Sequence, residues 1–147
     1  MAVGIWGALW VERRHQQRIR SEEEDGLLQA LGNAVDHNLE LCKQLREIVT
    51  VQDRDPTFLM DVDLLDAIFP RIAQLSDDPE AIAKLNGFRY QLHHLNRKLD
   101  LWLGWSRDNW GPSMGRHDRR SDLRKSVSEH ITTLQNAGQE LRRLLTE

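Results

Sequence analysis

The side chains best suited to metal chemistry are six histidines, and their spacing does not form a ligand set. A helical zinc site uses two histidines four residues apart with a carboxylate partner, and no pair has that spacing. His93 and His94 are adjacent, so they point about 100° apart on a helix. A di-metal bundle needs a Glu-x-x-His motif on each of two helices, and the sequence does not supply the pair. We therefore expect surface or flanking histidines, with no metal and no cofactor.

A second group of candidate ligands is the carboxylate cluster of Asp61, Asp63 and Asp66. A calcium-binding loop of this type also needs a central Gly and a Glu at its twelfth position, and both are absent. Acidic residues are common at helix starts, where they accept hydrogen bonds from free backbone N–H groups. We therefore expect Asp61 or Asp63 to cap a helix.

Nucleophilic chemistry has equally little support. There is no Gly-rich phosphate loop, and no Ser or Cys has a plausible base beside it in sequence. The one cysteine, Cys42, falls within a leucine pattern and is expected to be a buried small hydrophobe. These observations predict that the chain is not an enzyme.

A tryptophan-rich segment gives the clearest candidate surface. Trp102, Trp105 and Trp110 lie beside Arg107, Arg116, Arg119 and Arg120. Four interpretations stay open: a membrane-interface belt, a protein-binding hot spot, nucleic-acid stacking with phosphate contacts, or Trp102 and Trp105 filling the end of a helical core.

The start of the chain is the other candidate surface. Residues 1–11 (MAVGIWGALWV) are apolar and include Trp6 and Trp10, and a basic segment carrying Arg13, Arg14, Arg18 and Arg20 follows. Eleven residues form roughly 16 Å of helix, about half a bilayer. The run is expected to be the end of a longer transmembrane helix, a short interfacial anchor, or a contact with the bundle or a partner. Arginine directly after an apolar run is the positive-inside arrangement, which favours a membrane and a cytoplasmic bundle.

Composition and periodicity predict the scaffold. The chain has 147 residues, enough for one domain with a real core, and its net charge of −3 makes nucleic acid an unlikely partner. A 3–4 spacing of apolar residues predicts three long helices, over residues 1–51, 79–103 and from about 121 onward. Asp78 followed by Pro79 predicts the second start, and Gly104 the end. A short helix after Asp61 is expected to be broken or kinked at Pro70.

The expected fold is therefore all-α: an antiparallel bundle of three long helices plus one short broken helix, with the N-terminal helix extending beyond it. Residues 1–20 form the contact segment and residues 21–147 the bundle. Asn38, Tyr90 and Asn96 are expected as polar core residues, with Asn38 setting register or pairing with a buried polar group. We also expect both basic, Trp-bearing segments to lie at the same end of the bundle.

Three stretches carry a resemblance: GIWGALWVERRHQQR, EEEDGLLQALGNAVDHNLELCKQL and YQLHHLNRKLD. Together they resemble a loose group of uncharacterised bacterial proteins with one N-terminal transmembrane helix and a small cytoplasmic helical domain. In that pattern the late helix carries a Tyr and then an Asn, here Tyr90 and Asn96. The resemblance implies membrane anchoring and a bacterial source, and it implies no reaction.

These observations lead to one principal hypothesis and two alternatives. The principal hypothesis is a non-enzymatic accessory or scaffolding subunit at the cytoplasmic face of a bacterial inner membrane, contacting lipid or a larger membrane complex. The first alternative is a soluble, cytoplasmic helical module that self-associates, with residues 1–11 buried in a dimer contact. The weaker alternative is a regulatory domain that binds nucleic acid through its arginines.

Overall fold

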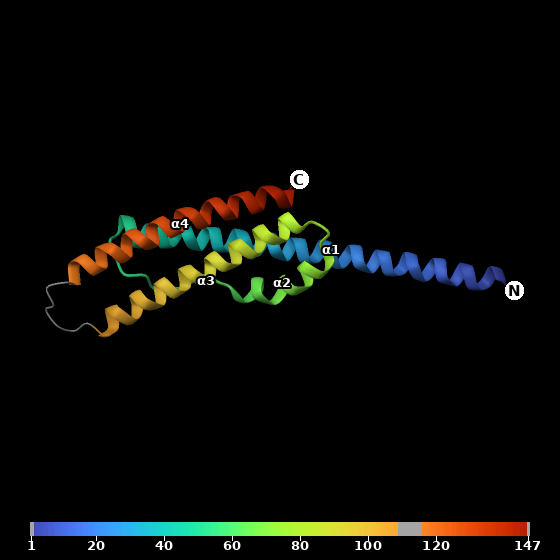
Figure 1. Ribbon diagram of the computed structural model, residues 1–147, viewed down its shortest axis with the longest axis horizontal. Helices are drawn as coiled ribbons and strands as arrows, with labels where there is room; N and C mark the ends of the chain where they lie inside the picture. Colours follow the sequence, from blue (N-terminus) through green and yellow to red (C-terminus); the bar gives the residue numbers. More distant parts are fainter. Residues whose placement is uncertain (1, 109–115, 147) are drawn as a thin grey trace.

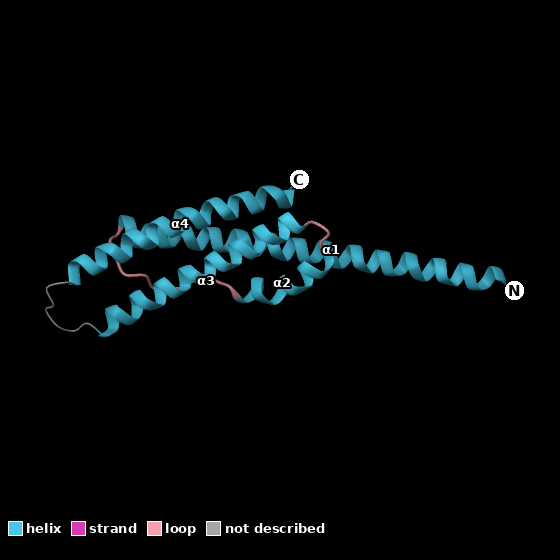
Figure 2. Cartoon of the chain, viewed as in Figure 1, coloured by secondary structure: helices cyan, strands magenta, loops and turns pink. Residues whose placement is uncertain are grey.

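The computed structural model describes residues 2–108 and 116–146, with side chains over residues 11–104 and 119–146. Most of the described residues belong to four helices: α1 (Ala2–Arg46), α2 (Asp63–Leu75), α3 (Pro79–Asp108) and α4 (Arg116–Thr146). A π-helical turn, Glu47–Val51, continues α1. There is no strand in the described ranges, as Figure 2 shows. The predicted all-α bundle is confirmed.

The four helices form a ring in which each neighbour is antiparallel (Figure 1). α1 packs against α4 and α2, and α3 packs against the same two helices. α1 and α3 therefore lie diagonally across the bundle and run in the same direction. α2 has only 13 residues, against 45, 30 and 31 for α1, α3 and α4. Because α1 is so much longer than its neighbours, its first part extends past the bundle.

The predicted apolar seams meet in one core. The fully buried positions come from all four helices, from the π-helical turn and from the segment before α2, and their spacing on the long helices is the expected 3–4 rhythm. Burial of this apolar surface is the main stabilising contribution to the fold. The most deeply buried side chains include Leu31, Val35, Leu45, Val49, Leu65, Phe88, Leu92, Leu95, Leu99, Trp102, Ile131 and Leu134. Leu28 of α1 lies outside this core and is 48% exposed.

The predicted start of α3 is confirmed by its capping hydrogen bonds. Asp78 Oδ1 accepts hydrogen bonds from the backbone N–H groups of Glu80 and Ala81, at 3.1 and 3.2 Å, as the Asp-Pro pair predicts. At α2 the N-cap residue is Val62 and no side chain caps the helix, so the prediction that Asp61 or Asp63 caps it is wrong. Asp61 Oδ1 instead accepts a hydrogen bond from the N–H of Asp63, at 3.3 Å.

Two predicted boundaries are wrong: α3 continues past Gly104 to Asp108, and α4 begins at Arg116, earlier than residue 121. At Pro70 the sequence predicts a break or a kink, and the break is wrong, because α2 runs through Pro70 to Leu75. Proline and glycine lower helix stability locally, but packing against the rest of the bundle outweighs that cost. Pro70 and Gly104 therefore lie inside helices.

Two asparagines fix the segment between the π-helical turn and α2. Asn38, on α1, accepts from the N–H of Asp61 at 3.0 Å and donates to the Asp61 carbonyl at 2.8 Å. Asn96, on α3, does the same to Met60, at 2.7 and 3.0 Å. Each side-chain amide thus satisfies both backbone groups of one residue in a segment that has no helix of its own. Asn38 is itself buried, and its partners in this segment are the backbone groups of Asp61.

Tyr90 does not belong to the core. Its side chain is 62% exposed, and its ring lies 6.0 Å from that of His94, one turn further along α3. Position 90 falls on the outer face of α3, between the turns that carry buried Phe88 and Leu92. The assignment of Tyr90 to the core is wrong, whereas Asn38 is 1% exposed and Asn96 partly buried.

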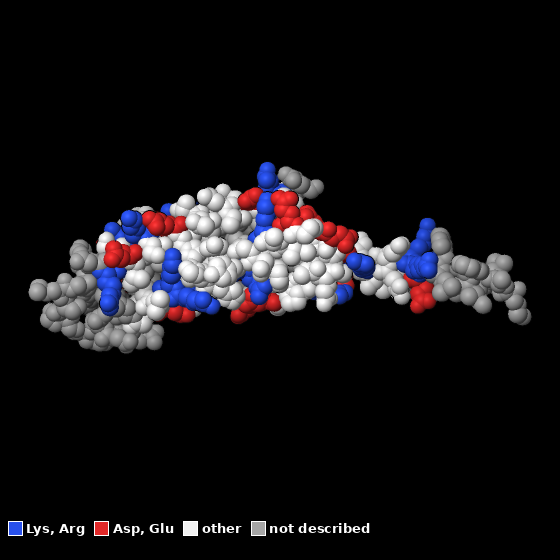
Figure 3. Space-filling view, viewed as in Figure 1, with Lys and Arg blue, Asp and Glu red and all other residues white. Residues whose placement is uncertain are grey.

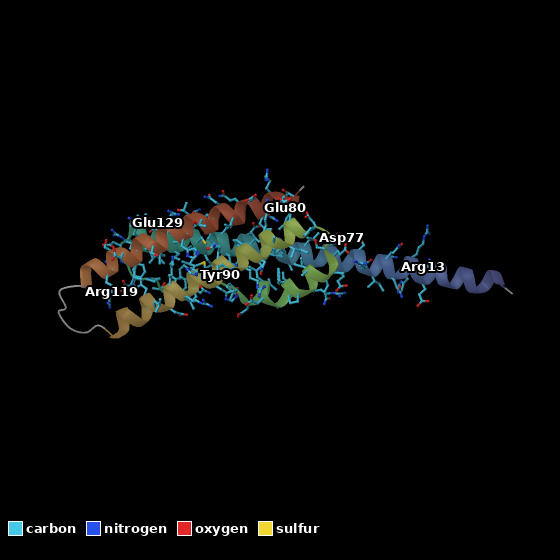
Figure 4. The ribbon with its side chains drawn as sticks, in the orientation of Figure 1. Arg13, Asp77, Glu80, Tyr90, Arg119 and Glu129 are labelled. Carbon is cyan, nitrogen blue, oxygen red and sulfur yellow. The ribbon has the colours of Figure 1, made fainter. Side chains whose placement is uncertain are left out.

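The two basic segments lie at opposite ends of the molecule, which corrects the predicted placement. Figure 4 labels Arg13 on the projecting part of α1 and Arg119 at the far end of the bundle. The cause is α2. Although short, it reverses the direction of the chain, so α3 ends beside the end of α1 and not beside its start.

Candidate interaction surface

The projecting part of α1 is a helix that is polar on all sides. Every described side chain from residue 11 to residue 22 is exposed, and between residues 12 and 26 the only large apolar side chain is Ile19. Ion pairs one turn apart support the helix, with Arg18 to Glu22 at 3.1 Å and Arg20 to Glu24 at 3.3 Å. Figure 3 shows basic and acidic side chains along this rod. A helix that is polar on all sides depends on such pairs for its stability, because it buries no apolar face.

The rod separates two apolar regions. Residues 12–26 span about 22 Å of helix, with the bundle after them and the apolar residues 2–11 before them. The interpretation that this run packs against its own bundle is wrong, because the continuous helix α1 carries it away from the bundle. Among the described residues, no helix has an apolar stretch long enough to cross a membrane.

Where α1 meets the bundle, α1 and α2 enclose two adjoining hollows, which together we term the shoulder groove. The outer hollow, about 450 Å³, is lined by Gln16, Ile19, Arg20, Glu23, Arg71, Gln74 and Leu75. The inner hollow, about 260 Å³, is lined by Glu24, Leu27, Leu28, Ile72, Leu75, Ser76 and Asp77. Leu75 lines both, so the groove is continuous. At this size the inner hollow fits one or two large side chains better than an organic cofactor.

A charged clamp fixes the α2 side of the groove. The guanidinium of Arg71 donates two hydrogen bonds to the carboxylate of Glu23, at 2.6 and 2.8 Å. Hydrogen bonding from Arg71 lowers the pKa of Glu23, so the pair stays ionised at neutral pH. A bidentate pair holds both groups in one geometry. It therefore ties the end of α2 to α1 at the base of the rod.

The tryptophan–arginine segment is only partly a surface. Trp102 is fully buried and donates its indole N–H to Asp55 at 3.0 Å, so the prediction that it contacts lipid or a partner is wrong. Arg120 pairs with Asp53 and Asp55, and Arg124 also pairs with Asp53. The basic side chain of Arg120 is therefore held by carboxylates of the same chain. Arg119 is exposed.

Several predicted contact residues have side chains that lie outside the described ones: Trp6, Trp10, Trp105, Trp110 and Arg116. The described members at the start of the chain, which are all exposed on the rod, are Arg13, Arg14, Arg18 and Arg20.

One cluster of titratable side chains links α2 to α3 at the surface, around Asp66. Asp66 accepts one hydrogen bond from Arg89, at 2.6 Å, and its Oδ2 atom lies 2.9 Å from the Nε2 atom of His93. Partial burial raises the pKa of Asp66, but the hydrogen bonds from His93 and Arg89 outweigh it and lower the pKa overall. Within the described side chains, no three potential ligands are close enough to hold a metal ion.

Cys42 has neither the exposure nor the environment of a nucleophile. It is fully buried, and burial raises the pKa of its thiol to about 12. A thiol in that state is almost entirely protonated at neutral pH and reacts slowly. Its Sγ lies 3.8 Å from the sulfur of Met60, as part of the core.

Sequence reasoning found the apolar run and the basic rod but missed the groove. Ile19 is 49% exposed, and its place in the pattern, an isolated apolar residue in a charged stretch, was the only local signal. Leu27 and Leu28 of α1 also line the groove, but the wall opposite them comes from Ile72 and Leu75, on a helix remote in sequence. Comparisons with protein-family models, curated proteins and solved structures find no match for this chain.

Proposed function

We propose that this chain is a non-enzymatic helical interaction module that self-associates through the projecting part of α1. The observation that carries the proposal is the arrangement of α1: an apolar run held beyond the bundle by a polar rod, with a groove at the base of that rod whose inner hollow has leucine and isoleucine walls. The run and the groove are complementary in character, yet α1 is one continuous helix and cannot fold back to join them.

Self-association resolves this separation. Apolar surface held away from its own core is stabilised by burial against another molecule. The shoulder groove offers Leu27, Leu28 and Leu75 for such burial, of which Leu28 is nearly half exposed in the single chain.

Sedimentation velocity of the full chain over a range of concentrations tests the proposal. We expect a concentration-dependent increase in mass, and a shift toward monomer when Trp6 and Trp10 are both replaced by Ser. Leu101→Ser is the matched control, because Leu101 is 69% exposed on α3, away from the groove. A chain that stays monomeric at all concentrations contradicts the proposal.

Attachment to a membrane surface is the second candidate, and one specific observation favours it. Along the rod the charge is ordered, with four arginines between residues 13 and 20 next to the apolar run and four acids, residues 22–25, next to the bundle. Anionic lipid attracts the first group and repels the second. In that case the bundle would lie at the cytoplasmic face of the membrane, contacting lipid or a membrane complex.

Flotation with vesicles separates the two candidates. The membrane candidate predicts that the full chain floats with vesicles containing anionic lipid, and that a chain lacking residues 1–20 does not. If the full chain instead stays in solution while its mass rises with concentration, self-association is supported and membrane attachment is contradicted.

A further inference from the structure

A second hollow lies on the outer side of α3, remote from the shoulder groove. It has a volume of about 460 Å³, and all the residues that line it belong to α3, between Ala83 and Arg97. We term it the α3 groove. Figure 4 labels Tyr90, which lines it near the middle of the helix. Among the described helices α3 packs only against α2 and α4, so this side of α3 is left uncovered.

The floor of the α3 groove is formed by small residues. Gly87 lies inside a helix, where glycine is less stable than alanine. Nothing in the described part of the chain requires a glycine there, because a Cβ atom at this position would meet no atom within 4 Å. With Ala83 one turn earlier, Gly87 leaves the backbone low beside the exposed ring of Tyr90. A floor of this kind allows another backbone to approach closely.

The direction of the groove favours a helix as its occupant. Positions 83, 87, 90 and 97 follow the 3–4 spacing that places residues along one side of a helix. They extend over about 21 Å of α3. The backbone of α3 is already hydrogen-bonded within the helix, so it has no free edge to which an extended peptide could add. A second helix can instead pack its side chains into the low stretch beside the Tyr90 ring.

The charge of the groove favours an acidic occupant. Its lining includes Arg89, His93 and Arg97 and no carboxylate. Asp66 of α2 pairs with Arg89 and His93 at one rim. Arg97 is exposed and has no hydrogen-bond or ion-pair partner among the described side chains. With His93 neutral, two arginines against one aspartate leave a net charge of +1.

The same charges disfavour a second copy of this chain. Two α3 grooves facing each other would bring arginine side chains together, which is unfavourable. The acidic stretch of α1, residues 22–25, is also a poor occupant, because three of its four carboxylates already pair with arginines of their own chain.

From this floor, this direction and this charge we infer that the α3 groove binds an acidic helix of another protein. Small residues of that helix pack over Gly87 beside the Tyr90 ring, and one of its carboxylates pairs with Arg97. Tyrosine and arginine are enriched among the residues that contribute most to protein interfaces. The inference goes beyond self-association through α1 and does not depend on it, since the α3 groove and the shoulder groove share no residue.

Two model peptides test the inference with the full-length chain. Both are alanine-rich helices of about 18 residues, because shorter isolated helices are marginal in water. One carries glutamate and the other lysine at every fourth position, and each has a fluorescent label at one end. Fluorescence anisotropy at low salt measures the affinity, and amide chemical shifts of the isotope-labelled chain locate the site. We expect the glutamate peptide to bind at least about tenfold more tightly than the lysine peptide, with shifts concentrated in residues 83–97.

Two variants separate recognition from folding. Arg97→Glu should weaken binding of the glutamate peptide by roughly tenfold. Its matched control is Arg143→Glu, exposed on α4 outside the groove, which should change the affinity by less than about twofold. Gly87→Gln should also weaken binding, because its side chain fills the groove. It should not lower the melting temperature, because glutamine favours a helix over glycine and points into open space.

Failure of the glutamate peptide to bind at about 1 mM overturns the inference. Equal binding of the two peptides overturns it as well, and so does binding that Arg97→Glu and Gly87→Gln both leave unchanged. If the amide signals of residues 83–97 shift when the chain alone is concentrated, this face is a contact between copies and the acidic partner is wrong. None of these results decides self-association through residues 2–11, which the Trp6 and Trp10 variant tests separately.

Discussion

Trp102 donates its indole N–H to Asp55 Oδ1 at 3.0 Å, and this bond joins α3 to the segment that follows the π-helical turn. The same oxygen accepts from Arg120 of α4 at 3.2 Å. One carboxylate therefore connects three parts of the chain at the end of the bundle remote from the rod. It lies beside the largest fully buried side chain, Trp102.

Replacing Trp102 should test this connection. We expect Trp102→Ala to lower the free energy of unfolding by roughly 3–5 kcal/mol, because it removes a large buried ring and leaves Asp55 without one donor. Trp102→Phe should cost less, since most of the apolar surface remains. Urea denaturation gives both values. Leu101→Ala is the control and should change stability by less than about 0.5 kcal/mol, because Leu101 is 69% exposed.

The asparagine clamp makes a separate prediction about the segment before α2. Asn38→Ala removes both hydrogen bonds to the backbone of Asp61 and leaves two backbone groups unpaired, so we expect a loss of roughly 2–4 kcal/mol in the free energy of unfolding. Amide exchange at Asp61 should accelerate as well. Asn33→Ala, on the exposed side of the same helix, is the matched control. Equal effects of the two variants would contradict the role given to Asn38.

Much of this bundle could be predicted from the sequence, because apolar spacing on a helix depends only on neighbours within two turns. The seams through Val35, Leu92 and Leu134 are of this kind, and all three residues are fully buried. The Asp78 cap is local too. By contrast, the local sequence predicts that Gly104 ends a helix and that Pro70 breaks or kinks one, yet both lie inside helices. Whether a helix continues past such a residue depends on how the whole helix packs in the bundle, and the local sequence does not contain that information.

The relative placement of segments that are distant in the sequence could not be predicted either, because it also depends on tertiary contacts. The direction of α3 relative to α1 depends on whether the short helix α2 reverses the chain, and a count of long helices alone misses that reversal. The shoulder groove requires Leu75 of α2 to come beside Ile19 of α1. The burial of Trp102 required its partner Asp55, 47 residues away, to be placed as well.

Two glycines on different helices should respond oppositely to alanine. A Cβ atom at Gly138 would lie 2.6 Å from Leu39 Cδ2 and 3.0 Å from Phe88 Cε2, whereas at Gly87 it would meet nothing within 4 Å. Gly138→Ala should therefore cost roughly 1–2 kcal/mol through overpacking. Gly87→Ala should stabilise the chain by roughly 0.5–1 kcal/mol, since alanine favours the helix. Thermal or urea unfolding of the two variants in parallel measures both signs, and stabilisation by Gly138→Ala would contradict the close α1–α4 contact.

Stability should also depend on pH through one buried histidine. His130 is 6% exposed on α4, its Nε2 atom has no hydrogen-bond partner, and its ring lies 5.1 Å from that of His94. Burial, with the nearby positive charge of Lys98 and the neighbouring His94, lowers the pKa of His130 from 6.5 to about 4. Folding thus favours the neutral imidazole.

The sign of the effect follows from proton binding. Between pH 6.5 and pH 4 the unfolded chain binds a proton at His130 that the folded chain does not, so the free energy of unfolding falls as the pH falls through this range. Each pKa unit corresponds to about 1.4 kcal/mol, which gives a loss of roughly 2–3 kcal/mol by pH 4. His130→Leu should remove that part of the pH dependence, and His15→Gln, on the exposed rod, should leave it intact. Urea unfolding of the three proteins from pH 7.5 to pH 4 measures the difference. If the curves of His130→Leu and the unmodified chain run parallel, His130 titrates in the folded state as it does in the unfolded one, and the buried, neutral state assigned to it is wrong.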